Sequence, residues 1–257
     1  MSSAEQIKQD YNKSAKSYND ASHVPSITLE SQLIKMALGD ASGLIALDLG
    51  GGAGLHAREA IELGAARVDI VDLSSEMLKV AQDVEESIGR KDRIRCYEAN
   101  VAKPMDHLPL DKGYDIVMAN WIFDHASEIE ILEGMWQNIS RYLKPGGIFV
   151  GVHVADLHGP AASDEKYGVS MQNPKPVPGG FTYTTIVHAD DPWDFQGTSL
   201  DISRLGSFEL HEKYGLEDIR IMPHEKAEAM QNDPGFWELW RQRPVFAVVR
   251  GTKRVQD

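Results

Sequence analysis

Four glycines and one aspartate carry the clearest chemical signal in this 257-residue chain. Gly50, Gly51, Gly52 and Gly54 lie between two apolar runs, and Asp72 ends the second run. Glycines let a chain turn sharply out of a strand, and they let a ligand lie directly against the backbone. A following helix points free N–H groups at that ligand, and a carboxylate about 20 residues later can accept hydrogen bonds from two ribose hydroxyls. The pattern predicts a strand–turn–helix–strand unit that binds a ribose-containing ligand.

This stretch alone leaves three interpretations open. It fits a dinucleotide site, and it fits a site for S-adenosylmethionine (SAM) equally well. A tight turn between a strand and a helix, without any ligand, is the third interpretation. Four adjacent glycine-type positions followed by a correctly spaced acid make the third one the weakest, and the remainder of the chain must decide between the first two.

The elements around this turn alternate between strand and helix, which predicts a parallel sheet with helices on both faces. In such sheets ligands bind at the carboxyl ends of the strands. Several polar residues follow those ends, so we expect them to lie close together. The predicted strands are 44–49, a run ending at residue 72, 93–99, 114–120 and 148–154, and helices are predicted at 3–20, 27–38, from 74 to 88, and 129–143.

The alternation stops after residue 155. Residues 156–200 hold several prolines and glycines and two strand-like runs, 181–188 and 193–200, which suggest a hairpin or lid inserted after the fifth strand. Beyond the lid the sequence predicts a helix at 202–214, a strand at 215–222, a helix at 233–241 and a last strand at 244–250. The last strand could enter the sheet antiparallel, between its neighbours. We treat residues 1–257 as a single domain with a helical cap at 1–40.

Composition narrows the possible functions. The formal net charge of −13 would repel phosphate backbones, so we expect no nucleic-acid partner. Cys96 is the only cysteine, which provides neither a disulfide framework nor a cysteine metal site, and we predict no metal. No apolar run has the length of a membrane span, and the first residues lack an apolar signal core, so we expect a cytoplasmic protein without membrane association.

The motifs together resemble those of class I SAM-dependent methyltransferases. The matching stretches are LDLGGGAG at 47–54, VDLSSEML at 71–78, FDHA at 123–126 and LKPGG at 143–147. The resemblance covers nearly the whole chain and implies a Rossmann-like α/β fold with a seven-stranded, mostly parallel sheet whose last strand is antiparallel. A looser similarity of QDYNKSAKSYN near the start and FWELWRQRPVFAVVR near the end points to small-molecule N-methyltransferases of the toxoflavin-biosynthesis type.

The resemblance also implies roles for individual residues. The glycines would line the methionine end of SAM, the aspartate after the second strand would hold the ribose, and two residues beside it would flank the adenine. Two tyrosines of the first helix would close over the amino-acid moiety, and an asparagine after the fourth strand would cover the sulfonium. The predicted cofactor-binding residues are Tyr11, Tyr18, Asp48, Gly50, Gly51, Gly52, Asp72, Leu73, Met77, Asn100, Val101 and Asn120.

Methyl transfer from a sulfonium is an in-line displacement, so alignment and exclusion of water are the main tasks of such an enzyme. A neutral amine acceptor needs no strong base, whereas a hydroxyl needs a base or must ionise readily. The titratable groups that we predict near the reacting atoms are His125, His153 and Tyr183. For each of them, core packing is the alternative interpretation.

The predicted function is transfer of a methyl group from SAM to a nitrogen or oxygen of a small secondary metabolite, by a monomer or homodimer. Two alternatives remain at this point. One is a protein that binds SAM without methylating, in a regulatory role or with a repurposed pocket. The other is an NAD-dependent oxidoreductase, which the sequence favours less because it contains no Tyr-x-x-x-Lys pair.

Overall fold

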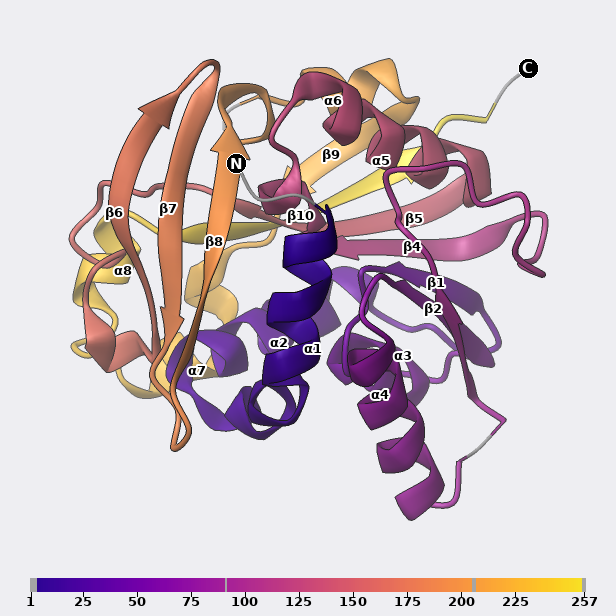
Figure 1. The fold of residues 1–257 in the computed structure, drawn as a ribbon, viewed down its shortest axis with the longest axis horizontal. Helices are drawn as coiled ribbons and strands as arrows, with labels where there is room; N and C mark the ends of the chain where they lie inside the picture. Colours follow the sequence, from indigo (N-terminus) through magenta and orange to yellow (C-terminus); the bar gives the residue numbers. More distant parts are fainter. Residues whose placement is uncertain (1–3, 91, 205–206, 256–257) are drawn as a thin grey trace.

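The computed structural model describes residues 4–90, 92–204 and 207–255. Its main feature is a seven-stranded sheet with the order β3-β2-β1-β4-β5-β10-β9 (Figure 1). The first five strands run parallel, and β10 is antiparallel to both β5 and β9. The strands are β1 Ile45–Leu49, β2 Arg67–Asp72, β3 Ile94–Glu98, β4 Tyr114–Asn120, β5 Leu143–Val154, β9 Leu216–Ile221 and β10 Phe246–Lys253. The predicted fold class is confirmed, including the antiparallel last strand between its neighbours.

Helices cover both faces of the sheet and divide its core in two. One apolar cluster joins the sheet to α2 and α3, and the other joins it to α5 and α6. The buried strands are apolar on both sides, as expected for parallel strands between two helical layers. The helices are α1 Ala4–Asp20, α2 Pro25–Leu38, α3 Leu55–Glu62, α4 Ser75–Ser87, α5 Ile129–Tyr142, α6 Glu209–Lys213, α7 Glu228–Asn232 and α8 Glu238–Gln242.

The lid is a second, three-stranded antiparallel sheet, not a simple hairpin. It consists of β6 Val169–Val177, β7 Gly180–Val187 and β8 Trp193–Leu200 in that order. The sequence did not predict β6 because Pro174 and Pro176 interrupt it. Proline is tolerated at a sheet edge, where its missing N–H costs no ladder bond, and β6 is an edge strand with a register shift between Gln172 and Lys175.

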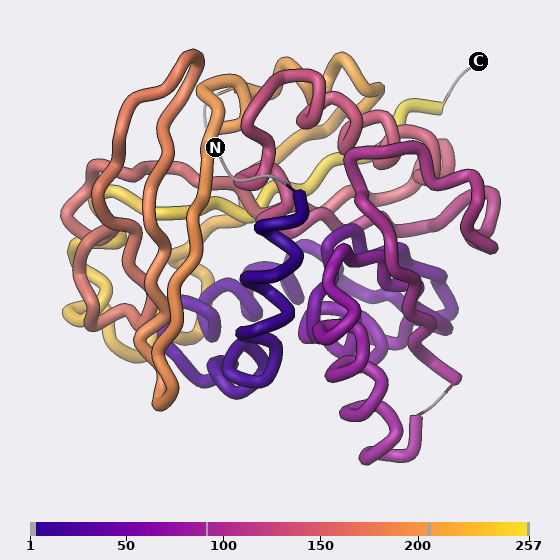
Figure 2. Tube along the Cα trace, in the orientation of Figure 1, coloured from indigo at the N-terminus to yellow at the C-terminus, as the bar shows by residue number. Residues whose placement is uncertain are grey.

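The N-terminal helix α1 lies between the lid and the half of the main sheet that contains β1, β2 and β3. It contacts β8 on one side and α4 on the other (Figure 2). The predicted cap is therefore present, and it joins the two sheets over the carboxyl ends of the central strands. Residues 1–3 of the predicted first helix and cap are outside the described residues.

Three predicted boundaries were wrong. β5 begins at Leu143, so LKPGG forms the start of a strand, with Gly146 at a positive φ of 75°. The predicted helix 202–214 is in fact a 3₁₀ turn, Asp201–Ser203, followed later by the short α6, and residues 205–206 lie outside the described part. The predicted helix 233–241 begins only at Glu238, because proline and glycine occupy the preceding turn.

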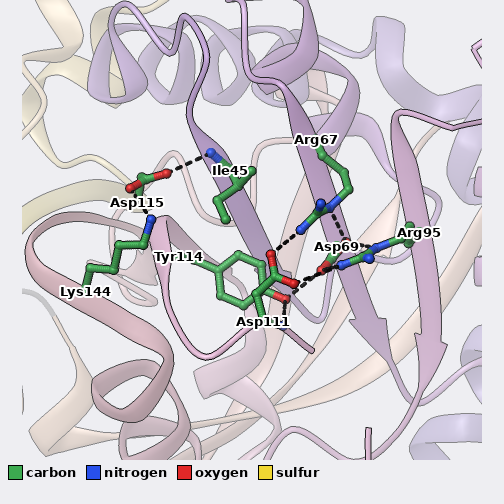
Figure 3. Close-up of polar contacts among 8 residues, drawn as sticks. All are labelled: Ile45, Arg67, Asp69, Arg95, Asp111, Tyr114, Asp115 and Lys144. Atoms are coloured by element: carbon green, nitrogen blue, oxygen red, sulfur yellow. Dashed lines mark hydrogen bonds and ion pairs between the residues drawn. The ribbon is translucent and has the colours of Figure 1, made fainter. Parts of the chain in front are cut away.

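Below the ligand-binding edge, a network of paired charges holds the start of the sheet together (Figure 3). Asp69 of β2 is fully buried and accepts hydrogen bonds from Arg67, from Arg95 at 2.7 Å and from the Tyr114 hydroxyl at 2.6 Å. Asp111 pairs with Arg67 and donates its backbone N–H to the same tyrosine hydroxyl. These contacts join β2, β3 and the start of β4, so they fix the strands whose other ends form the candidate site.

Candidate functional site

The glycine turn after β1 has the geometry that its sequence requires. Gly50 and Gly52 have positive φ angles of 71° and 50°, a conformation that L-residues with side chains rarely adopt. A side chain at Gly50 would also collide with Ile122, since its Cβ would lie 2.3 Å from a methyl carbon of that residue. The turn leads directly into α3, so backbone N–H groups at the start of the helix face the same edge of the sheet.

Asp48 packs beneath this turn. A Cβ at Gly51 would lie 2.6 Å from a carboxylate oxygen of Asp48, which explains why this glycine is needed even though its φ is ordinary. Asp48 is 1% exposed, and neither carboxylate oxygen has a hydrogen-bond partner among the described residues. Burial raises its pKa to about 6, partly offset by the positive field of His56.

Asp72 at the end of β2 faces the turn. Its two oxygens accept hydrogen bonds from the backbone N–H groups of Gly52, at 2.9 Å, and Ser74, at 2.8 Å. A carboxylate has about four acceptor sites, so this residue retains capacity for two further donors. Burial raises the pKa of Asp72, and the backbone donors oppose that shift. The aspartate therefore holds the turn in place and still has acceptor capacity for a ligand's hydroxyls.

A cavity of about 300 Å³ opens between the glycine turn, α1 and the loop after β4. Its size is at the lower end of the roughly 300–1,000 Å³ that small-molecule sites occupy. Its lining includes most of the residues predicted to bind the cofactor: Tyr11, Tyr18, Gly50, Gly52, Asp72, Leu73, Met77, Asn100, Val101 and Asn120. Asp48 and Gly51 are not among the lining residues. Gly51 belongs to the turn itself, and Asp48 packs beneath it.

Asn120 is the most exceptional polar group in this cavity. It ends β4 and is only 8% exposed, and neither its amide nitrogen nor its amide oxygen has a partner among the described residues. Buried amides are almost always hydrogen-bonded, so an unpartnered one indicates a ligand position. The next residue, Trp121, has a left-handed backbone with φ 64°, and strain of this kind gathers at functional sites.

A second, smaller cavity of about 100 Å³ adjoins the first. The lid supplies one wall through Tyr183 and Phe195, and α2 and α3 supply another. The residues that line both cavities are Tyr11, Tyr18, Trp121 and His125. These four side chains form the boundary between the cavities, which we call the cavity boundary below.

Aromatic contacts tie the cavity boundary to the lid. The Tyr11 hydroxyl is 2.9 Å from His125 Nε2, and the Tyr11 ring lies 5.5 Å from Phe195. Trp193 stacks on Phe195 at 5.4 Å and packs against Tyr18 at 5.3 Å. Such ring pairs contribute roughly 0.5–1.5 kcal/mol each beyond area burial, so they stabilise the closed arrangement of α1 and β8.

His125 has one free ring nitrogen. Its Nδ1 is buried without a partner among the described residues, and burial lowers its pKa to about 4. The imidazole is therefore neutral at pH 7, a form in which one ring nitrogen donates a proton and the other accepts one. Of the three residues predicted to be catalytic, His125 is the one that lines both cavities.

Asp124 and Tyr183 meet in the smaller cavity. Asp124 is 4% exposed, and its Oδ2 has no partner among the described residues. Burial raises its pKa to about 7, against the opposing effect of the neighbouring Ser199 and Tyr183 hydroxyls. The same pairing and burial raise the pKa of Tyr183, so its hydroxyl remains protonated and can act as a hydrogen-bond donor.

A charged triad forms the wall opposite the lid. His56 donates hydrogen bonds to Glu30 at 3.1 Å and to Glu59 at 2.8 Å, and Trp121 Nε1 donates to the same Glu30 oxygen at 2.9 Å. Burial alone would lower the pKa of His56, but the two glutamates raise it to about 10. The triad therefore contains an imidazolium between two carboxylates, and it fixes the indole of Trp121 at the cavity boundary.

His153 occupies a different environment. It is 3% exposed, its Nδ1 contacts the Ser203 carbonyl at 3.0 Å, and its ring stacks on Phe123 at 4.7 Å. It lines neither of the two cavities. The structure thus brings His125 and Tyr183 to the smaller cavity and leaves His153 in the aromatic core, consistent with the packing interpretation.

Sequence reasoning missed several site residues. Glu30 and His56 were not predicted, because they lie on two different helices and only the fold brings them together. Asp124 was not predicted as a site residue, and the position of Phe195 depends on the lid. A buried glutamate in an otherwise apolar helix face, as at Glu30 within ITLESQLI, was the one local signal available.

Neither a membrane-spanning helix nor a metal-binding cluster occurs among the described residues. No helix within the described ranges is both long and apolar enough to cross a membrane. Among the same residues, no group of three His, Cys, Asp or Glu side chains is arranged to hold a metal ion.

Comparison with known proteins points to one domain type. Residues 46–147 match the methyltransferase domain family. The ribosomal protein L11 methyltransferase of Desulforamulus reducens is 34% identical over 103 residues, which are 40% of this chain and 30% of that protein. The matched region spans less than a third of the length of each curated relative found.

Solved structures extend the similarity over the whole fold. The CcbJ methyltransferase from Streptomyces caelestis has a TM-score of 0.64 and 19% identity, covering 96% of this chain and 98% of that one. The [4+2]-cyclase SpnF has a TM-score of 0.63 and 16% identity, covering 99% and 98%. At such identities the likeness shows the fold alone. The chain therefore has the Rossmann-like class I methyltransferase fold, and its residues 46–147 match the model of a methyltransferase domain.

Proposed function

We propose that the protein transfers a methyl group from SAM, bound in the larger cavity, to a small-molecule acceptor in the smaller one. The observation that carries this proposal is the meeting of the two cavities at the cavity boundary. A displacement at a sulfonium needs the nucleophile, the methyl group and the sulfur in line, with water excluded. Two adjoining cavities that share four side chains are suited to both requirements.

In this arrangement the ribose hydroxyls bond to Asp72, and the adenine lies between Leu73 and Met77. Asn120 offers its unpartnered amide to the atoms around the sulfonium. The methyl group then points across the cavity boundary, between Trp121 and His125. This orientation places the reactive carbon next to the acceptor and away from solvent.

The acceptor side favours a compact molecule. A cavity of about 100 Å³ is below the usual range for ligand sites, so larger acceptors require movement of the lid. His125 and Tyr183 are the catalytic candidates, as neutral groups that orient the acceptor through hydrogen bonds. The proposal also includes the acceptor atom, for which we favour nitrogen over oxygen. It further includes a cytoplasmic location, a monomeric or homodimeric state, and a relation to the methyltransferases of toxoflavin biosynthesis.

Calorimetric titration with SAM, S-adenosylhomocysteine and NADH tests the cofactor assignment. We expect micromolar binding of both adenosyl ligands and none of NADH. Asp72→Ala should weaken that binding by roughly 1.5–3 kcal/mol, typical of hydrogen bonds to a charged group. Asp194→Asn, on the outer surface of β8, is a matched control and should leave it unchanged. Binding of NADH alone, or of none of the three, would overturn the proposal.

A second candidate is a SAM-binding protein that catalyses a different reaction. The specific observation in its favour is the similarity to a [4+2]-cyclase over 99% of this chain. Incubation with methyl-labelled SAM and a panel of compact amines and alcohols separates the two candidates. Label in an organic product supports methyl transfer, whereas tight SAM binding without label in any product supports the second candidate.

A further inference from the structure

One carboxyl oxygen in the smaller cavity has no partner. Asp124 is 4% exposed and lines this cavity, and its Oδ2 makes no hydrogen bond to any described residue. Leaving a buried acceptor unsatisfied costs roughly 1–3 kcal/mol. A site that retains such a group in an otherwise apolar cavity has a position prepared for a hydrogen-bond donor or a cation.

The cations of the cavity wall are already engaged. His56 lies between Glu30 and Glu59, which balance its charge. Arg58 donates to the Ala53 carbonyl at 2.7 Å and to Asn19 at 3.4 Å. Neither forms an ion pair with Asp124 among the described residues. A cationic ligand would supply the counter-charge that these residues do not.

The remaining walls suit a cation as well. Aromatic rings from α1, the loop after β4 and β8 surround the cavity, and ring faces attract cations by roughly 0.5–2 kcal/mol each. The Tyr183 hydroxyl lies beside Asp124 and can support its charged form. An anion would meet two buried carboxyl groups, Glu30 and Asp124, and would be repelled. The rings that these three elements contribute include Tyr11, Tyr18, Trp121, Trp193 and Phe195.

We infer that Asp124 recognises the nitrogen of a compact, largely apolar amine and receives its proton, with Tyr183 as a positioning residue. This inference rests on the proposed function. The amine enters as an ammonium ion, pairs with Asp124 and passes one proton to Oδ2. The neutral nitrogen then attacks the methyl carbon, the N–C bond forms as the C–S bond breaks, and S-adenosylhomocysteine leaves. The methylated product leaves as a secondary ammonium ion, and Asp124 returns its proton to solvent before the next turnover.

A set of three matched probes tests this assignment. Benzylamine, benzyl alcohol and benzoate have similar shape and differ in charge, and each is titrated into the complex with S-adenosylhomocysteine. We expect benzylamine to bind at least tenfold more tightly than benzyl alcohol and benzoate to show no binding. In Asp124→Asn the preference for the amine should vanish, while binding of the alcohol stays within about twofold. Asp194→Asn, which removes an exposed carboxylate from the same lid, should leave all three affinities unchanged.

The outcomes separate this inference from the proposed function. Failure of S-adenosylhomocysteine to bind would overturn the proposed function itself. Binding of S-adenosylhomocysteine together with equal or tighter binding of the alcohol or benzoate would overturn the amine assignment alone. The wild-type selectivity is decisive even where Asp124→Asn does not fold. An unchanged amine preference in a folded Asp124→Asn protein would also refute the role of Asp124.

Discussion

Two buried aspartates of the same sheet system have opposite surroundings. Asp69, in the middle of β2, is fully buried and accepts hydrogen bonds from two arginines and a tyrosine. Asp124, after β4, is 4% exposed and has an oxygen with no partner. Burial is thus nearly equal, and only the pairing differs. A carboxylate that the fold already satisfies stabilises the protein, whereas one left unsatisfied is available for a ligand.

The same contrast separates two regions of the sheet. Toward the start of the strands, the charges around Asp69 and Asp115 are paired with arginine and lysine (Figure 3). At the carboxyl ends, Asp48, Asn120 and Asp124 all have unpartnered buried atoms. An unpartnered buried polar atom costs stability, so the meeting of three such residues at one edge favours a binding site there.

The largest expected effect concerns the paired region. Asp69→Ala should lower the free energy of unfolding by roughly 3–5 kcal/mol, because it leaves two arginines and a buried tyrosine hydroxyl without their shared partner. Denaturant unfolding measures this change. Glu133→Gln, which breaks an ion pair with Lys213 at the surface, should cost less than about 1 kcal/mol. Equal losses in the two variants would contradict the contrast.

Asp124→Asn should raise the free energy of unfolding, whereas Asp69→Ala lowers it. Because the folded pKa of Asp124 is raised to about 7, the folded state binds its proton more tightly than the unfolded state does. Its ionisation therefore removes stability as pH rises from about 4 to 7, and the loss is complete above pH 7. The variant should gain on the order of 4 kcal/mol over the wild type at pH 8 and nothing below pH 4.

Unfolding curves of both proteins across this pH range provide the test. The groups that face Asp124 from other elements are Tyr183 of β7 and Tyr11 of α1, and burial raises the pKa of both, so neither titrates between pH 4 and 8. The raised pKa of Asp48 makes the stability of both proteins depend on pH in the same direction. Its contribution therefore cancels in the difference between their unfolding free energies. If the difference in unfolding free energy between the two proteins does not change with pH, Asp124 is not a buried carboxyl without a counter-charge.

Asn120→Ala sharpens the contrast on the ligand side. Its amide makes no hydrogen bond to the described residues, so its removal should leave the unfolding free energy within about 0.5 kcal/mol of the wild type. Binding of S-adenosylhomocysteine should weaken about fivefold, equivalent to roughly 1 kcal/mol for one lost hydrogen bond. Calorimetry and thermal unfolding of the same sample measure both. A large loss of stability with unchanged affinity for S-adenosylhomocysteine would mean that the Asn120 amide supports the fold and does not bind the ligand.

The smallest effect is expected at the cavity boundary. Tyr11→Phe keeps the ring contacts and removes only the hydroxyl that meets His125 Nε2. We expect a stability loss of about 1 kcal/mol or less, because the lost hydrogen bond is between neutral groups. Chemical-shift changes of the His125 ring in NMR spectra would report the broken contact. A stability loss as large as that of Asp69→Ala would mean that the contact between Tyr11 and His125 holds the fold together, as the contacts of Asp69 do.

The sequence predicted the part of the site that local patterns determine. The glycine turn, Asp72 and the strand ends follow from the order of apolar runs, because one βαβ unit brings them together. The helix predicted from residue 74 is also present, and the Ser74 hydroxyl caps it by accepting from the Met77 N–H at 3.1 Å. Most of the predicted cofactor residues line the larger cavity for that reason.

The acceptor side could not be predicted in the same way. The contact between Tyr11 and His125 joins residues 114 positions apart, and the indole of Trp121 meets Glu30 from 91 positions away. Such contacts depend on how α1, α2 and the lid pack, which periodicity does not determine. His153 shows the converse, since its place at a strand end suggested chemistry, but its ring lies in an aromatic cluster.

The most direct test of the account is a crystal structure of the protein with bound SAM. We predict the ribose hydroxyls on Asp72, the adenine beside Leu73 and Met77, and the sulfonium methyl directed at Trp121 and His125, toward the cavity that holds Asp124. A methyl group directed at solvent, or SAM bound outside the larger cavity, would contradict methyl transfer across the cavity boundary.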